Sequence, residues 1–210
     1  MIENAAVLPE AVAQKLRADI IAQKDAPGSA ITESAVALRF GVARPTARIA
    51  IDRLVADGLL RREAHRAARV PQLSRDDVRD LFDTRSIVES AAMGALAEAG
   101  AIPAEALAAH RSLTATEDFA TDDIQFHRAL VAGQPSSRLT RLHELLMGEI
   151  ELCIGQVQSA QLITAREVAE QHQGILDAIT AGDSATAERL TSDHIMGARD
   201  RLLTYLDTES

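Results

Sequence analysis

Aromatic residues and cysteine are scarce in this sequence. Its 210 residues include no Trp, one Tyr and four Phe, and Cys153 is the single cysteine. A lone cysteine excludes an intramolecular disulfide. The apolar share of 47% consists largely of Ala and Leu, which are strong helix formers and leave little β-branched material for a large sheet. We therefore expect a mainly α protein.

Long uncharged apolar stretches are missing as well. No segment approaches the roughly 18 consecutive apolar residues that a membrane span needs. Residues 1–10 carry neither the basic start nor the apolar core of a secretory signal. These absences predict a cytoplasmic protein with no membrane partner. The length exceeds the usual size of one domain, about 100 to 150 residues, so we expect two domains.

Charge divides the chain into two unequal parts. The net charge is −9, yet residues 1–73 hold 11 Lys and Arg against 8 Asp and Glu, whereas residues 74–210 hold 11 against 23. Seven of the arginines lie between positions 44 and 69. Each phosphate that an arginine neutralises releases counterions, so this density favours a DNA backbone. The asymmetry predicts a DNA-binding domain over 1–73 and a second domain over 74–210.

Hydrophobic spacing and turn residues predict the elements of the first part. Helices are expected over about 9–22, 33–40 and 43–57, with Pro9 in the first turn of the first helix. Thr32 is expected to cap the second helix, and Gly41 to end it. Strands over 59–62 and 67–70 would form a hairpin with its tip at 63–66. Two helices joined by a short Gly-containing turn and followed by a hairpin indicate a winged helix-turn-helix.

The second part is predicted to be an all-helical bundle. After a linker over 71–74, Ser74 and Asp77 have the spacing of a capping box at the start of a helix that runs to about Ala99. Further helices fit about 103–115, 117–132, 137–158, 165–180 and 184–206, with Gly and Pro residues between several of them.

Three blocks of the first part carry a specific resemblance. They are Pro27–Glu33, Phe40–Arg48 and Arg53–Leu60. Over residues 10–71 the sequence resembles the GntR family of bacterial transcription regulators. The major groove admits one helix, and Arg reads guanine through two hydrogen bonds. The resemblance implies that Arg44 and Arg48 contact DNA, with Thr46 between them as a further contact. Solvated surface arginines are the alternative interpretation.

Three positions depart from the family pattern. Ala43-Arg44-Pro45-Thr46 stands where members usually carry Ser-Arg-Thr-Pro, Ser34 replaces a common Arg, and Ala67 stands at the usual wing Gly. The operator sequence therefore cannot be borrowed from relatives. His65 and Arg66 at the wing tip are candidates for a minor-groove or phosphate contact, with simple exposure of His65 as the alternative.

Four residues of the second part have the character of metal ligands. Asp123 and His127 are four positions apart and so lie one turn apart on the same helix face. His172 is in step with Ile175, Leu176 and Ile179, and His194 with Leu190. This periodicity predicts that both imidazoles face the interior of the bundle.

Over residues 74–206 the sequence resembles the FCD ligand-binding domain of the FadR-type branch of GntR regulators, in its smaller VanR-type variant. The domain's Asp-x-x-x-His, His and final-helix His pattern is met at Asp123, His127, His172 and His194. The match implies one divalent ion, Zn²⁺, Ni²⁺ or Mn²⁺, with positions open for water or a ligand carboxylate. Buried, hydrogen-bonded histidines without a metal are the alternative. His110 and His143 fall outside the pattern and are expected at the surface.

Arg85 and Glu89 match an Arg-x-x-x-Glu pattern in the first helix of that domain. In relatives the Arg often faces the cavity, which implies that Arg85 binds an anionic effector. A salt bridge between residues i and i+4 on a solvated face is the alternative. Some family members instead bind acyl-CoA without a metal, which the three histidines argue against.

These observations predict a homodimeric transcription regulator, and not an enzyme, that binds a double-stranded operator as a repressor or activator. Two copies of the reader are needed to cover a palindromic site. A small carboxylate metabolite at the metal would control its affinity for DNA. Two alternatives are a regulator for which the metal itself is the effector and, from another class, a metallohydrolase. A hydrolase would need a general base and would gain nothing from an Arg-rich winged helix.

Overall fold

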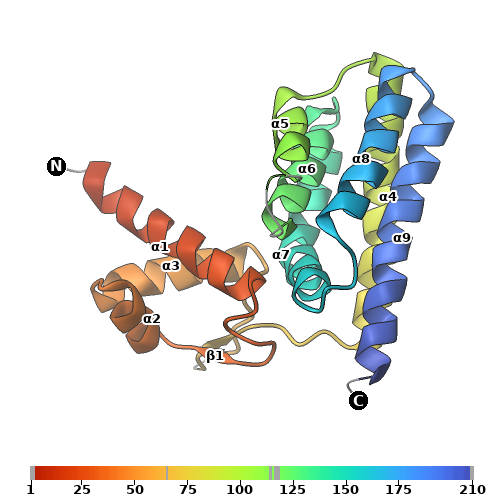
Figure 1. The fold of residues 1–210 in the computed structure, drawn as a ribbon. Helices are drawn as coiled ribbons and strands as arrows, with labels where there is room; N and C mark the ends of the chain where they lie inside the picture. Colours follow the sequence, from red (N-terminus) through yellow and green to blue (C-terminus); the bar gives the residue numbers. More distant parts are fainter. Residues whose placement is uncertain (1–2, 65, 114, 116–118, 209–210) are drawn as a thin grey trace.

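The computed structural model describes residues 3–64, 66–113, 115 and 119–208, which are mainly helical. Figure 1 shows a small N-terminal unit beside a longer helical bundle. The elements of the small unit are α1 (Glu3–Ile21), β1 (Ala30–Ile31), α2 (Glu33–Phe40), α3 (Arg44–Ala56) and β2 (Ala68–Arg69). Those of the bundle are α4 (Arg75–Ala99), α5 (Ala104–Ser112), α6 (Ala120–Gly133), α7 (Ser137–Ser159), α8 (Ala165–Thr180) and α9 (Ser184–Thr208).

The small unit is built on α3, against which both α1 and α2 pack. The Thr32 side chain accepts a hydrogen bond from the Ala35 amide at the start of α2, and Gly41 ends the helix with φ of 65°. Both were predicted, because a hydroxyl satisfies a free amide at a helix start and glycine tolerates left-handed backbone. Apolar side chains of α1, α2, α3 and the strands close one hydrophobic cluster.

Two predictions for this unit were wrong. The first helix begins at Glu3, so Pro9 lies inside α1 and not in its first turn. In the sheet, β2 pairs antiparallel with β1, Ala30 opposite Arg69 and Ile31 opposite Ala68. The expected hairpin partner over 59–62 contributes a single bridge, between Arg61 and Arg69. The segment before α2 therefore takes most of the pairing that sequence reasoning gave to the hairpin.

The bundle is arranged around α4 and α9, which lie side by side along their length (Figure 1). Ser74 and Asp77 form the predicted capping box at the start of α4, and Thr164 and Glu167 form another at the start of α8. The remaining helices enclose two further hydrophobic clusters. As a result, α6, α8 and α9 present their inner faces to one another. Among the described residues, none of the helices combines the length and apolar character needed to cross a membrane.

The two units meet at α7 through close backbone contact. A Cβ atom at Gly148 would overlap the backbone of residues 57–59, and one at Gly155 would overlap the backbone of Ile21. Leu152, between the two glycines, joins the hydrophobic cluster of the small unit. The buried Glu151 carboxylate lies 2.5 Å from the Arg17 guanidinium of α1 and 2.8 Å from that of Arg128 on α6. A long helix of the bundle thus rests directly on the helices of the small unit.

Candidate metal centre and nucleic-acid interface

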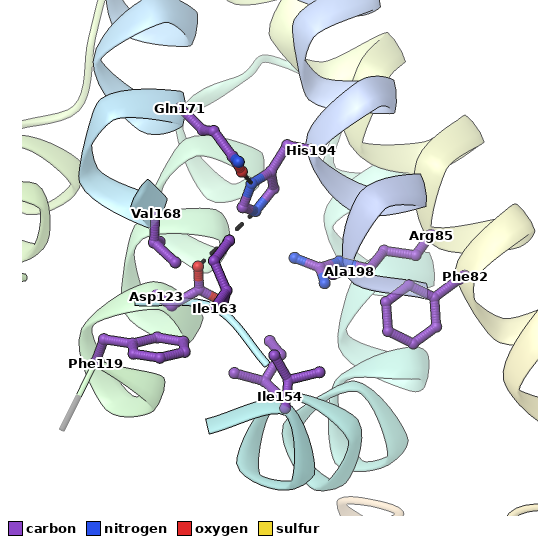
Figure 2. A pocket seen from close by; sticks show the side chains of 11 residues that line it. Phe82, Arg85, Phe119, Asp123, Ile154, Ile163, Val168, Gln171, His194 and Ala198 are labelled. Atoms are coloured by element: carbon purple, nitrogen blue, oxygen red, sulfur yellow. Dashed lines mark hydrogen bonds and ion pairs between the residues drawn. The ribbon is translucent and has the colours of Figure 1, made fainter. Parts of the chain in front are cut away.

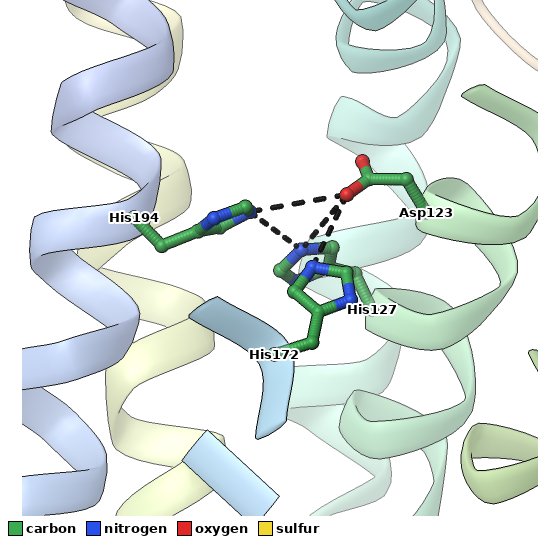
Figure 3. Close-up of side chains that lie close together, drawn as sticks. All are labelled: Asp123, His127, His172 and His194. Carbon is green, nitrogen blue, oxygen red and sulfur yellow. Dashed lines mark hydrogen bonds and ion pairs between the residues drawn. The ribbon is translucent and has the colours of Figure 1, made fainter. Parts of the chain in front are cut away.

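Three helices bring the four predicted ligand residues together. Asp123 and His127 come from α6, His172 from α8 and His194 from α9, and one donor atom of each lies within 4.8 Å of all the others. Figure 3 shows the three imidazoles and the carboxylate pointing at a common centre. The Nε2 atoms of His127 and His194 are 3.2 Å apart. Oδ1 of Asp123 lies 3.2 Å from Nε2 of His172, 3.8 Å from that of His127 and 3.9 Å from that of His194.

These spacings fit the donor set of a divalent transition metal. Bonds of about 2.0 to 2.2 Å in a tetrahedral site put donors about 3.3 Å apart, close to the separations found here. All four side chains are buried. In the described part of the chain, Nδ1 of His172 has no hydrogen-bond partner, and Nε2 has an ion-pair contact of 3.2 Å with Asp123 that lacks hydrogen-bond geometry. A buried imidazole without a partner is costly unless another ligand satisfies it, and an ion at the common centre would do so at Nε2.

Groups behind the ligands orient two of the imidazoles. Nδ1 of His127 lies 2.6 Å from a Glu89 oxygen, and Nδ1 of His194 lies 2.7 Å from the Gln171 amide oxygen. When Nδ1–H of His194 donates to Gln171, its Nε2 lone pair is directed to the centre, as in many metal sites. The contact between His127 and Glu89 is an ion pair that lacks hydrogen-bond geometry. The His172 ring stacks on Phe126, with centroids 3.8 Å apart. Glu89, Gln171 and Phe126 were not assigned these roles from the sequence.

The expected surface position of His143 was wrong. Its side chain is 1% exposed and Nε2 lies 2.9 Å from Oε1 of Glu89, the same oxygen that accepts a hydrogen bond of 2.7 Å from Nε of Arg85. Both groups surround a fully buried carboxylate that needs compensating donors. His110, also expected at the surface, is half-buried, with Nε2 3.0 Å from the Gln173 amide oxygen.

Burial and mutual proximity set the charge state of the cluster. Burial lowers the pKa of His172 to about 4, although the Asp123 carboxylate opposes the shift. Burial and the two neighbouring imidazoles lower the pKa of His194 well below its usual value. Burial would raise the pKa of Asp123, but His172, His127 and His194 together outweigh it and lower that pKa. Neutral imidazoles beside an ionised carboxylate are the protonation states that bind a metal ion.

A small cavity of about 20 Å³ adjoins the cluster, enough for about one water molecule. Figure 2 shows the Arg85 guanidinium pointing into it, opposite Asp123 and His194. Arg85 does form the i,i+4 salt bridge with Glu89, but both residues are buried and not on a solvated face. The two interpretations of this pair from the sequence are therefore not exclusive: Arg85 is paired with Glu89 and also lines a cavity.

The predicted DNA-contacting residues line a groove on the small unit. Arg44 and Arg48 of α3 face Arg66 of the wing across about 380 Å³ of open space. The first two side chains are 69% and 67% exposed, and their acidic partners are distant: Glu33 lies 3.8 Å from Arg44, and Asp52 and Glu33 lie 3.8 and 4.0 Å from Arg48. Arg62 also lines this groove. Arg62 was not predicted as a groove residue, although it belongs to the same arginine-rich stretch of sequence.

Of the other predicted DNA contacts, Thr46 belongs to α3 and Arg66 to the wing. Thr46 is half-buried in the first turn of α3, where no side chain caps the helix. Arg66 is exposed and its guanidinium lies 2.8 Å from the carboxylate of Glu63. His65 lies outside the described residues. Free backbone amides at the α3 start and movable guanidinium groups are both suited to phosphate oxygens.

Two family models match this chain. The family of bacterial regulatory proteins, gntR family, matches residues 8–70, and the FCD domain matches residues 80–197. The chain is 30% identical over 208 residues to the HTH-type transcriptional regulator BphR of Paraburkholderia xenovorans (strain LB400), covering 92% of this chain and 84% of that one. It is also 30% identical to a protein of Paenarthrobacter nicotinovorans named as a D-xylose utilization operon transcriptional repressor, covering 83% and 80%.

Solved structures share the fold over nearly the whole chain. A transcriptional regulator GntR from Rhodococcus sp. RHA1 is 27% identical with a TM-score of 0.75, over 93% of this chain and 97% of that one. The E. coli protein McbR/YncC is 17% identical with a TM-score of 0.74, over 95% and 98%, a likeness that concerns the fold alone.

Proposed function

This chain belongs to the GntR family of bacterial transcriptional regulators and carries an FCD domain, and from that premise we propose that a small carboxylate bound at a metal ion controls its affinity for operator DNA. The family assignment accounts for the arginine groove without any catalytic role. The single observation that carries the effector part is the convergence of Asp123, His127, His172 and His194 beside the cavity that Arg85 lines.

The four side chains would hold one ion, Zn²⁺, Ni²⁺ or Mn²⁺, and leave room in its coordination shell for a further ligand. When bound, the ion would supply a positive charge to which a carboxylate can coordinate. Arg85 would pair with the same anion from the other side of the cavity. Three helices would then be joined by ligands to one ion, so occupancy would affect the packing of α6, α8 and α9 together.

We propose Arg44, Thr46, Arg48, His65 and Arg66 as DNA contacts within a DNA-binding domain over 1–73, and residues 74–210 as the effector domain. Largely separate hydrophobic clusters support this division, although Leu152 of α7 joins the cluster of the small unit and Ile21 of α1 joins one of the bundle. Operators are commonly palindromic and need two readers one helical turn apart, so we propose a homodimer. The relative from Paenarthrobacter nicotinovorans is named a repressor, and repression is the sign of regulation proposed here.

A chain of ion pairs would couple the metal centre to α3, the recognition helix that carries Arg44 and Arg48. Arg128 follows His127 on α6 and pairs with Glu151 of α7, which pairs with Arg17 of α1. Arg17 also pairs with Asp57 at the end of α3. Because these groups link all the elements between the two sites, a shift of α6 on metal or effector binding would reach α3.

The test measures DNA affinity by fluorescence anisotropy, with a fragment selected by the protein from a random pool. Protein stripped with a chelator and protein reloaded with Zn²⁺ are compared with and without a panel of small organic acids. Affinity that changes only when metal and acid are both present supports the proposal. If metal alone produces the whole change, the ion is the effector. If neither changes the affinity, the proposed control is wrong.

A further inference from the structure

The wall of the cavity beside the metal centre has two chemically different sides. Asp123, Gln171 and His194 form a polar side together with Arg85. Phe82, Phe119, Ile154, Ile163 and Val168 are buried apolar residues that also line it, and Figure 2 shows the first three away from Gln171 and His194. Such a division positions a polar head at one end and hydrocarbon at the other.

Arg85 points to an anionic head. Its side chain is 1% exposed, and Nε is satisfied by Glu89 at 2.7 Å. Nη2 has no hydrogen-bond partner in the described part of the chain, and the guanidinium faces the cavity (Figure 2). A buried N–H without an acceptor is unfavourable. A carboxylate oxygen in the cavity would supply that acceptor.

The net charge around the cavity favours the binding of one negative group. With a divalent ion bound, neutral imidazoles, the Asp123 carboxylate and the Arg85–Glu89 pair leave one positive charge in excess. Among the described residues that line this cavity, Arg85 is the only Lys or Arg. A second carboxylate would therefore be buried against hydrocarbon without a partner, and so would a row of hydroxyl groups.

Resting on the proposed function, we infer that the effector is a short aliphatic monocarboxylate. Its carboxylate lies between the metal and Arg85, and its hydrocarbon part contacts the apolar side formed by Phe82, Phe119, Ile154, Ile163 and Val168. Dicarboxylates and polyhydroxy acids are excluded by the same wall. The cavity of about 20 Å³ holds about one water molecule before the acid binds, so binding must move the apolar side chains apart, and an acid with few carbons needs the smallest movement.

Three acids of similar size separate these classes: isobutyrate, malonate and glycerate. Isothermal titration calorimetry on full-length, Zn²⁺-loaded protein measures each affinity, and zinc analysis after each titration confirms that the acid has not removed the ion. We expect isobutyrate to bind about tenfold more tightly than either competitor, or better. Tighter binding of malonate or glycerate would overturn this inference and leave carboxylate control intact. No binding by any of the three would also overturn this inference, whereas carboxylate control itself is decided by the DNA-affinity test with the panel of acids.

A substitution on α9 tests whether the acid lies in this cavity. Ala198 lines the cavity one turn after His194 and is only half-buried, so a longer side chain can be accommodated there. Ala198→Lys adds a second cation and should reverse the preference in favour of malonate. Thr204→Lys, on an exposed position of the same helix, is the matched control and should keep the preference for isobutyrate. If Ala198→Lys leaves the order of affinities unchanged, the acid does not lie in this cavity and the inference fails.

Discussion

The arginine groove and the histidine cluster differ most in what holds their side chains in place. Arg44 and Arg48 are about two-thirds exposed, and their contacts with Glu33 are long, at 3.8 and 4.0 Å. His127 and His194 are buried, and each is oriented through Nδ1 by an oxygen within 2.7 Å. Exposed ion pairs are weak and are easily exchanged for phosphate, whereas a buried donor set is fixed before its ligand arrives. The groove can therefore be changed at little cost in stability, and the cluster cannot.

The largest effect is expected when a proposed metal ligand is removed from the cluster. His127→Ala and His194→Ala should each remove the stabilisation that a bound ion gives, about 4 kcal/mol when free metal is a thousandfold above its dissociation constant. Thermal unfolding with added Zn²⁺ and with a chelator measures it. His110→Ala, on a histidine outside the cluster, should keep the full response. A His127→Ala variant that Zn²⁺ stabilises as strongly as the wild type would contradict the assignment of this ligand.

Changes in the groove should weaken DNA binding and leave stability almost unchanged. Arg44→Ala and Arg48→Ala should each weaken operator binding by about 1 to 3 kcal/mol while leaving the metal response and the unfolding temperature almost unchanged. Anisotropy titrations and thermal unfolding of the same samples test both halves of the statement. Arg111→Ala, on an exposed residue of α5, is the control for a lost positive charge. Unchanged affinity in both groove variants would remove the recognition-helix assignment.

The contact between the small unit and the bundle can be tested by adding a single carbon atom. Gly148→Ala places a Cβ against the backbone of residues 57–59, so it should destabilise the protein by about 2 kcal/mol through overpacking. It should also uncouple DNA affinity from the metal centre while zinc binding persists. Gly174→Ala on α8 is the matched control, because its Cβ would meet only Leu190 at 3.5 Å. Equal behaviour of the two variants would show that the contact at Gly148 carries no coupling.

Local sequence patterns predicted the helices and the inward-facing ligand residues. Contacts between residues that are distant in sequence were missed. The i,i+4 spacing paired Asp123 with His127, and periodicity turned His172 and His194 inward, as found. The β1–β2 pairing was missed because two-residue strands have no measurable periodicity. The burial of His143 was missed because its partner, Glu89, is 54 positions away. The same reason applies to the cavity, whose wall combines α4, α6, α7, α8 and α9.

The smallest effect is expected at the junction of the small unit and the bundle, where α4 begins. The Ser74 hydroxyl accepts a hydrogen bond of 3.1 Å from the Asp77 amide, and the Asp77 carboxylate accepts bonds from the Ser74 hydroxyl and amide at 2.7 and 2.9 Å. Ser74→Ala should cost about 1 kcal/mol of unfolding free energy, the usual value for an N-cap. Urea unfolding measures it, with the exposed Ser159, at the C-terminal end of α7, as the control site for Ser→Ala.

Asp77 gives that junction a pH dependence of known sign. The hydrogen bonds from the Ser74 hydroxyl and amide lower the pKa of Asp77 below its ordinary value of 3.8. A carboxyl group whose pKa is lower in the folded state stabilises the fold above its unfolded pKa, and that contribution is lost as the pH falls through the folded pKa. The stability difference between wild type and Asp77→Asn should therefore be constant at neutral pH and shrink below about pH 4. Urea unfolding at a series of pH values measures it, and a difference that grows toward acid pH would contradict the role of the carboxylate in the cap.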